Sequence, residues 1–158
     1  KNILVIGSSG QIGSELTREL RKRYGNEHVV AGYIKGAEPS KELQETGPMA
    51  EADVTNGEMI AEIVRKYNID AIYNLAALLS VEQAPAGLED CIDGLWNILE
   101  VAKDHKCQVF TPSSIGSFGP NTPKVDTPQD TVQRPKTIYG VSKVTTELLS
   151  DWFHTKYG

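Results

Sequence analysis

The sequence predicts an α/β fold, a doubly wound parallel sheet with helices on both faces. Short apolar runs of strand length alternate along the chain with stretches of helical periodicity, a pattern typical of parallel sheets. The first run, residues 3–6, is apolar at every position, as expected of a strand that is buried on both faces. A glycine-rich loop, residues 7–13, leads from it into a helix. That helix is predicted to pack on the strand through Ile12, Leu16 and Leu20.

The glycine loop has the spacing Gly7-x-x-Gly10-x-x-Gly13 in place of GxGxxG. Between a strand and a helix, Gly7 permits a tight turn, Gly10 lets phosphates approach the backbone, and Gly13 lets helix and strand pack closely. The helix start adds unpaired N–H groups and a positive dipole end, so the loop is a candidate pyrophosphate site. The alternative is a glycine-rich turn that binds no ligand.

Length, composition and charge set the broad class. The 158 residues suit one domain, with 39% hydrophobic and 23% charged residues, as in ordinary globular proteins. The net charge of −5 argues against a nucleic-acid partner, and no apolar run is long enough to cross a membrane. Cys91 and Cys107 lack metal-site spacing, so we expect no metal and a reduced protein, with Cys107 a small buried side chain.

A strand begins almost at once, so no secretory signal is expected. The expected compartment is the cytoplasm, or the mitochondrial matrix if a targeting segment has been removed.

The second predicted strand, residues 28–34, ends where a dinucleotide-binding fold has an acidic residue that accepts hydrogen bonds from the adenosine ribose. Gly32 and Tyr33 stand at that position. Lys35 follows, and it has two interpretations: a partner for the 2′-phosphate of NADP, or an ordinary solvated lysine.

Residues 36–48 show no clear periodicity and are predicted to form an irregular connection. A weak strand at residues 49–52 ends at Asp53-Val54, and Thr55 or Asn56 is predicted to cap the next helix. Just past a third strand, the aspartate has two interpretations. It accepts a hydrogen bond from an adenine amino group, or it is another helix cap.

The fourth predicted strand, residues 69–77, ends in small side chains that leave room for a flat cofactor ring. Ser80 lies in the loop after it, and residues 81–90 are expected to be loop. A helix is predicted over residues 88–105. Its inward-facing residues are predicted to be Leu95, Ile98, Leu99, Val101 and Ala102.

The fifth predicted strand, residues 108–111, leads to Pro112-Ser113-Ser114. Residues 119–136 carry four prolines and are predicted to form a long irregular loop, which in a compact domain usually has a function or acts as a lid. The last helix is predicted to open near Thr137. Its apolar positions are Val141, Val144, Leu148, Leu149, Trp152 and Phe153.

Within this last helix, Tyr139 and Lys143 are spaced i and i+4 and therefore share a face. A lysine held one turn from a tyrosine stabilises the phenolate, so the pair can act as a general base on an alcohol. As a bare pattern Tyr-x-x-x-Lys is common, and most copies are ordinary surface pairs.

Five motifs follow one another along the chain. They are Gly7-x-x-Gly10-x-x-Gly13, Asp53-Val54, Leu75-Ala76-Ala77, Ser113-Ser114 with Phe118-Gly119, and Tyr139-Gly140-Val141-Ser142-Lys143. In this order they resemble an extended short-chain dehydrogenase/reductase, the superfamily of nucleotide-sugar epimerases and dehydratases. Within it the chain is similar to the short-chain-type L-threonine 3-dehydrogenases. The supporting stretches are residues 10–17, 76–80, 112–115, 118–123 and 134–140.

The resemblance implies a Rossmann-type fold, NAD as cofactor, and oxidation of the C3 alcohol of L-threonine to 2-amino-3-ketobutyrate. It makes Tyr139 the general base, Ser114 the residue that orients the same oxygen, and Lys143 the partner of the nicotinamide ribose. Ser80 is implied as a contact to the amino-acid substrate, and no metal is needed. The implied cofactor-binding residues are Gly7, Gly10, Gln11, Ile12, Gly13, Tyr33, Asp53, Val54, Leu75, Ala76, Ala77, Tyr139 and Lys143.

The chain departs from the family pattern at three places. Gly32-Tyr33 replaces the acid after the second strand, so NADP stays open beside NAD. Cys91 stands where relatives usually carry an asparagine that helps to hold a proton-relay water. The chain ends just after the Tyr-x-x-x-Lys helix, so residues 1–158 are expected to be an incomplete NAD(P)-binding domain without the substrate domain.

Two other functions stay open on the sequence alone. A nucleotide-sugar epimerase or dehydratase shares every superfamily motif, and a truncated chain could bind a nucleotide or a partner without turnover. Helices such as 88–105 and 137–157 form the dimer interface in relatives, so a homodimer is expected. The expected substrate is a small molecule.

Overall fold

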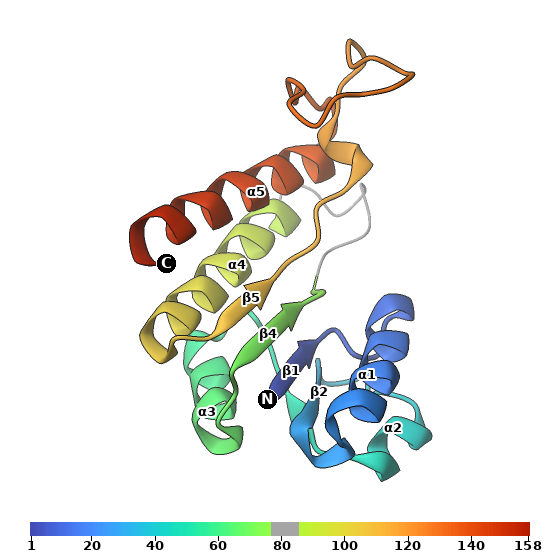
Figure 1. Cartoon of the computed structure of the whole chain (residues 1–158), viewed down its shortest axis with the longest axis vertical. Helices are drawn as coiled ribbons and strands as arrows, with labels where there is room; N and C mark the ends of the chain where they lie inside the picture. The colour runs from blue at the N-terminus through green and yellow to red at the C-terminus, as the bar shows by residue number, and fades with distance from the viewer. Residues whose placement is uncertain (77–85) are drawn as a thin grey trace. The chain divides into compact units, whose positions relative to one another are not determined.

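The computed structural model describes residues 1–76 and 86–158 of the chain (Figure 1). The strands are β1 (Ile3–Ile6), β2 (Val29–Tyr33), β3 (Met49–Glu51), β4 (Ala71–Asn74) and β5 (Gln108–Phe110). The α-helices are α1 (Gln11–Tyr24), α2 (Lys41–Thr46), α3 (Gly57–Tyr67), α4 (Ala86–His105) and α5 (Ile138–Tyr157). The described residues also form the short 3-10 helices η1 (Asn26–His28) and η3 (Ile115–Ser117).

The strands form one parallel sheet in the order β3-β2-β1-β4-β5 (Figure 1). This order confirms the predicted doubly wound, Rossmann-like fold. Ile6 pairs with Gly32 on one side and with Asn74 on the other, so the carboxyl ends of β1, β2 and β4 are level. The chain builds outward from β1 to β3 and then returns to the other side of β1 with β4. In open α/β sheets, ligands bind at the strand carboxyl ends where the order reverses.

The chain divides into two compact units. The first comprises residues 1–76 and 94–112 and contains the whole sheet, with the second part of α4. The second contains residues 113–158, with η3, α5 and the long loop between them, together with the beginning of α4. The division falls within α4, just before Gly94.

Helices cover both faces of the sheet in the first unit. On one face, α3 and α4 pack Ile60, Val64 and Ile98 against Leu4 and Ile72, all buried. On the other face, α1 packs Leu20, with Leu16 partly buried, against residues of β1 and β2. The five inward positions predicted for α4 are all buried, because a helix against a sheet needs an apolar stripe of that width.

The predicted buried face of α1 is partly wrong. Ile12 is 69% exposed, and the buried residues of the helix are Gly13, Thr17, Leu20 and Arg21. Gly13 packs against the glycine loop, where a Cβ would lie 2.0 Å from the Gly7 carbonyl oxygen, so only a residue without a side chain fits there. Each residue of an α-helix turns by about 100°, so the preceding Ile12 points away from the sheet.

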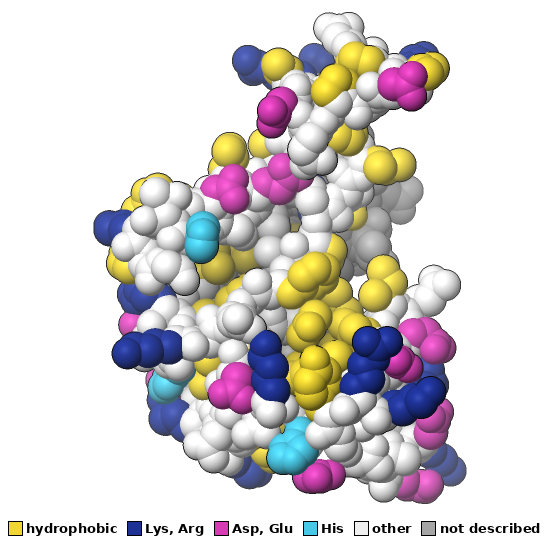
Figure 2. Space-filling model, viewed as in Figure 1, with side chains coloured by type: hydrophobic (Ala, Val, Ile, Leu, Met, Phe, Trp, Pro, Cys, Tyr) yellow, Lys and Arg dark blue, Asp and Glu magenta, His cyan; other side chains and the backbone are white. Residues whose placement is uncertain are grey.

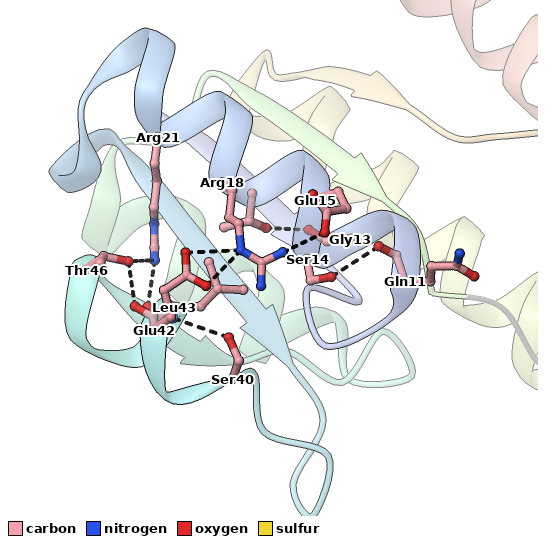
Figure 3. Close-up of polar contacts among 11 residues, drawn as sticks. Gln11, Gly13, Ser14, Glu15, Arg18, Arg21, Ser40, Glu42, Leu43 and Thr46 are labelled. Carbon is pink, nitrogen blue, oxygen red and sulfur yellow. Dashed lines mark hydrogen bonds and ion pairs between the residues drawn. The ribbon is translucent and has the colours of Figure 1, made fainter.

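The predicted irregular connection at residues 36–48 contains the short helix α2. Its first turn is capped by Ser40, whose Oγ accepts a hydrogen bond from the Leu43 N–H at 3.5 Å. The buried guanidinium of Arg21 donates to the Leu43 carbonyl at 2.6 Å and to Thr46 Oγ1 at 2.9 Å (Figure 3). A second arginine of α1, Arg18, forms an ion pair with Glu42 of α2 at 2.9 Å (Figure 3). The helix is therefore held by tertiary contacts, which a six-residue pattern does not reveal.

Several other boundaries differ from the prediction. The second strand is shorter than residues 28–34, because η1 precedes it, and the fourth strand ends at Asn74. Residues 86–90, expected to be loop, are already the first turns of α4. On α5, Val141, Leu148 and Trp152 are exposed, whereas Phe153 is buried.

Cys107 was predicted to be a small buried side chain, and it is half-buried next to β5, packed against the core. Its thiol donates to the Ile69 carbonyl at 3.1 Å. Burial, with a smaller contribution from Asp70, raises the pKa of the Cys107 thiol and keeps it neutral.

No helix among residues 1–76 and 86–158 is both long and apolar enough to span a membrane. On the face seen in Figure 2, basic and acidic side chains are interspersed instead of gathering into one patch of a single sign.

Candidate functional site

The glycine loop between β1 and α1 is folded tightly against the end of β2. Gly7 has φ +84°, in the region that favours glycine, and its N–H donates to the Gly32 carbonyl at 3.1 Å. The buried Ser8 donates to the same carbonyl from its N–H at 3.0 Å and from Oγ at 2.8 Å. A Cβ on Gly13 would lie 2.0 Å from the Gly7 carbonyl oxygen, so helix and loop are in direct backbone contact.

Gly10 differs from the other two glycines of the loop. Its φ is −74°, and a Cβ there would approach only the Gly7 carbonyl oxygen, at 3.4 Å. The fold therefore accepts a side chain at residue 10, although it accepts none at Gly7 or Gly13. A glycine that folding does not require leaves the exposed backbone open to a ligand, as a pyrophosphate site needs.

The amino terminus of α1 has the properties of an anion site. Its N-cap is Gly10, with no side-chain cap, and its first turn has no acidic residue. The first N–H groups of a helix have no partner within the helix, so those of Gln11, Ile12 and Gly13 are available to a ligand. The helix dipole favours negative charge at the same point. These residues fit the pyrophosphate of a dinucleotide.

The segment after β4 runs beside the glycine loop. The Leu75 N–H donates to the Ile6 carbonyl at 3.0 Å, and a Cβ on Gly7 would lie 3.1 Å from the Leu75 carbonyl carbon. Asn74 is buried and accepts from the Ala76 N–H at 3.2 Å, which turns the chain at the end of the strand. The structure thus brings Leu75 and Ala76 next to the loop. Ala77 and Ser80 lie outside the described residues.

The end of β2 has no acidic side chain at the predicted ribose position. A Cβ on Gly32 would lie 3.0 Å from the Val5 carbonyl oxygen, so position 32 leaves little room for a side chain, and Tyr33 is the next residue that can present one. Lys35 is exposed in the turn that follows. The Glu38 carboxylate accepts from the Gly36 N–H at 3.0 Å, and this bond lowers the pKa of Glu38.

Asp53 follows β3 and is held by its own turn. Its Oδ1 accepts from the Thr55 N–H at 3.0 Å and from Thr55 Oγ1 at 2.7 Å. The cap of α3 is Asn56, whose Oδ1 accepts from the Met59 N–H at 3.1 Å. Of the two interpretations of Asp53, the helix cap is therefore not the one observed. Both contacts use one carboxylate oxygen.

Val54 is fixed against α4. A Cβ on Gly94 would lie 2.6 Å from Val54 Cγ2, and Asn97 Nδ2 donates to the Val54 carbonyl at 2.9 Å. The turn at Asp53-Val54 is thereby locked at the carboxyl end of the sheet, the edge that also carries the glycine loop.

In the second unit, Ser114 and Tyr139 are close neighbours of one glycine. Ser114 caps η3 and its Oγ accepts from the Gly116 N–H at 3.1 Å. A Cβ on Gly116 would lie 3.1 Å from Cδ1 of the Tyr139 ring and 3.4 Å from Ser114 Oγ. A Cβ on Gly140 would lie 2.2 Å from the Gly116 carbonyl oxygen, so η3 and the start of α5 touch backbone to backbone.

Tyr139 and Lys143 lie in the first two turns of α5, which Thr137 caps by accepting from the Gly140 N–H at 3.0 Å. Lys143 is buried, and its Nζ lies 5.7 Å from the centroid of the Tyr139 ring. The predicted shared face is confirmed. The catalytic roles of Ser114, Tyr139 and Lys143 stay predictions.

The sequence did not single out Gly116 or Glu147. Gly116 lies so close to the Tyr139 ring that any side chain there would press on it. In the sequence, its position two residues after Ser114 was the only available indication that it belongs to the site. Glu147 lies one turn beyond Lys143 on α5, at the same i+4 spacing, and binds Ser113 and Gln133. In the described part of the chain, no three His, Cys, Asp or Glu side chains are grouped so that they could hold a metal ion.

The sequence profile of the NAD dependent epimerase/dehydratase family matches residues 3–158. Uncharacterized epimerase/dehydratases of Staphylococcus epidermidis and Staphylococcus saprophyticus are 45% and 46% identical over 161 residues. Both matches cover 100% of this chain and 50% of the relative. The chain thus spans about half the length of the curated relatives it matches.

Solved structures give the same coverage. An L-threonine dehydrogenase from Clostridium difficile is 47% identical with a TM-score of 0.92, over 100% of this chain and 50% of that one. A GalE-like L-threonine dehydrogenase from Cupriavidus necator, solved in its holo form, is 36% identical with a TM-score of 0.92, over 100% and 51%. A UDP-glucose 4-epimerase from Thermotoga maritima is 25% identical with a TM-score of 0.88, over 100% and 52%.

Proposed function

Because the chain belongs to the NAD-dependent epimerase/dehydratase family, we propose that it supplies the cofactor-binding and catalytic part of an L-threonine 3-dehydrogenase. The observation that carries the proposal is the arrangement around Gly116, where Ser114 and the Tyr139 ring meet and Lys143 lies on the same face of α5. The assignment of L-threonine as the substrate rests on similarity. The chain is 47% identical to the Clostridium difficile threonine dehydrogenase and 25% identical to the Thermotoga epimerase.

The residues of the first unit fit NAD. The uncapped start of α1 and the glycine loop would bind the pyrophosphate, and the Asp53-Val54 turn would lie at the adenine end. When bound, NAD supplies the hydride acceptor. Position 33 lacks the acid that selects for NAD, so we propose NAD as the main cofactor without strong rejection of NADP.

In the proposed reaction, Tyr139 takes the proton from the C3 alcohol of L-threonine. Ser114 donates a hydrogen bond that orients the same oxygen. Lys143 stabilises the tyrosine anion from the next turn of the helix, because a nearby positive charge favours the ionised form. Holding the alcohol against the base lowers the barrier by positioning as well as by proton removal. We propose a homodimer as the working form.

A nucleotide-sugar epimerase or dehydratase is the second candidate, supported by the family match and by the Thermotoga epimerase. The two are distinguished by incubating the full-length protein with NAD and either L-threonine or UDP-glucose. We expect the wild-type protein to form NADH when L-threonine is present. The Tyr139→Phe variant should bind NAD but form no NADH. Turnover of the UDP-sugar without any threonine oxidation would overturn the first candidate in favour of the second.

A further inference from the structure

Glu147 of α5 uses both oxygens of its carboxylate to hold two separate segments of the second unit. Its Oε1 accepts a short hydrogen bond from Ser113 Oγ. Its Oε2 accepts from Gln133 Nε2 at 2.9 Å. Hydrogen bonds to a charged acceptor are about twice as strong as those between neutral groups, so one side chain fixes both segments to the helix.

The first segment is the one that carries Ser114. Ser113 precedes it directly, and the buried Ser117 donates to the Ser114 carbonyl at 2.8 Å, which closes η3. Gln133 donates to Ser117 Oγ at 3.2 Å in addition to its bond with Glu147. Glu147 therefore holds the Ser114 segment twice, directly through Ser113 and indirectly through Gln133.

The second segment is the neck of the long loop, defined by Gly119 and Arg134. A Cβ on Gly119 would lie 2.0 Å from the Arg134 carbonyl oxygen, so the backbone segments at the two ends of the loop are in contact. Gln133 stands one residue inside this neck. Its bond to Glu147 joins the loop of residues 120–133, the orange trace at the top of Figure 1, to the helix that carries Tyr139 and Lys143.

We propose that Glu147 is a positioning residue for the reaction of this family, which holds Ser114 in register with Tyr139 and fixes the neck of the loop. On α5, Tyr139, Lys143 and Glu147 follow one another at intervals of four residues and share one face of the helix. That face therefore carries the proposed base, the lysine beside it and the positioning residue Glu147. The inference rests on the proposed function for its catalytic consequence. Its structural part stands on the three contacts alone.

The test uses four variants of the full-length protein. Glu147→Ala removes both bonds, and we expect kcat/KM to fall and tryptic cleavage after the exposed Lys124 to quicken, each by roughly tenfold. Glu147→Gln keeps both bonds, since its amide accepts from Gln133 and donates to Ser113 Oγ, and should stay near wild type. Gln133→Glu sets two carboxylates side by side and should behave like Glu147→Ala. Adding Glu147→Gln to it restores a donor–acceptor pair between residues 133 and 147 and should recover both readouts in part, because the bond that Gln133 donates to Ser117 Oγ stays lost.

Asp151→Asn is the matched control, because Asp151 is an exposed carboxylate one turn further along α5. Affinity for NAD should stay near wild type in every variant, since the pyrophosphate residues belong to the first unit. The inference is overturned if Glu147→Ala matches Asp151→Asn in both readouts, or if the double variant is no better than Gln133→Glu. If the wild type oxidises no threonine, the proposed function fails, while the cleavage rates of the four variants still decide the role of Glu147.

Discussion

The carbonyl oxygen of Gly7 occupies the place that a side chain at Gly13 would need, 2.0 Å from an ideal Cβ. This contact joins the glycine loop to the first turn of α1 and aims the start of the helix at the carboxyl end of the sheet. Gly10, three residues before Gly13, has no such contact. The loop therefore contains one glycine required for packing and one that is free for a ligand.

Alanine substitutions separate these two requirements. Gly13→Ala forces the backbone apart and should lower the free energy of unfolding by roughly 1–3 kcal/mol, as overpacked cores do. Gly10→Ala should leave that free energy nearly unchanged and weaken NAD binding, because its methyl group would stand at the proposed pyrophosphate site. Thermal unfolding and NAD titration measure the two effects. Equal NAD affinity in Gly10→Ala and wild type would place the pyrophosphate elsewhere.

The cofactor preference should depend on residue 33. Tyr33→Asp restores a carboxylate at the end of β2, which accepts hydrogen bonds from the ribose of NAD and repels the 2′-phosphate of NADP. We expect the ratio of the NADP Kd to the NAD Kd to rise by about tenfold, the effect of one charged hydrogen bond. Tyr33→Asn is the neutral control and should change the ratio little. An unchanged ratio in Tyr33→Asp would mean that the ribose lies away from this strand end.

Arg21 should be among the most sensitive positions for stability. Its guanidinium is buried and also donates to the Val29 and Pro48 carbonyls at 3.2 and 2.8 Å, and burial lowers its pKa. Arg21→Met leaves several buried acceptors without donors, so we expect a loss of roughly 2–4 kcal/mol in denaturant unfolding. Arg23→Met, on the exposed side of the same helix, should cost no more than about 0.5 kcal/mol. Equal losses in the two variants would contradict this role.

Tyr139→Phe tests the proposed role of Tyr139 as the general base. The ring and its packing on Gly116 are kept, so the fold and the NAD affinity should be unchanged, whereas kcat should fall by about 10²–10⁴. Tyr157→Phe, at the exposed far end of α5, is the control. If NAD affinity and kcat fell together in Tyr139→Phe, the tyrosine would be assigned to cofactor binding and not to proton transfer.

The parts of the fold that follow from local sequence were predictable. The apolar run of β1, the stripe of α4 and a cap of α3 at Thr55 or Asn56, which the structure places at Asn56, each depend on neighbouring residues only. The helix α2 was missed because its stability comes from Arg21, twenty residues earlier, and not from its own pattern. Ile12 was placed in the core because four-residue spacing does not show that Gly13 is the residue that packs against the glycine loop.

In the candidate site, too, local geometry was predictable from the sequence, whereas contacts between distant segments were not. The i,i+4 spacing placed Tyr139 and Lys143 on one face, since a helix fixes that geometry. No spacing rule predicts that Gly116 meets both the Tyr139 ring and Ser114, or that Glu147 reaches Ser113 from 34 residues away. These contacts depend on how the long loop returns to the helix. They become visible only once the chain is folded.

The closed neck at Gly119 and Arg134 makes the loop between them a replaceable module. Because its two ends already touch, the entropy of closing a longer or shorter loop changes slowly with its length. We therefore expect residues 120–132 to tolerate changes in length and sequence, with Ser114 and Tyr139 left in place. A change in this exposed segment would then leave the contacts of Gly116 with Ser114 and Tyr139 unaltered.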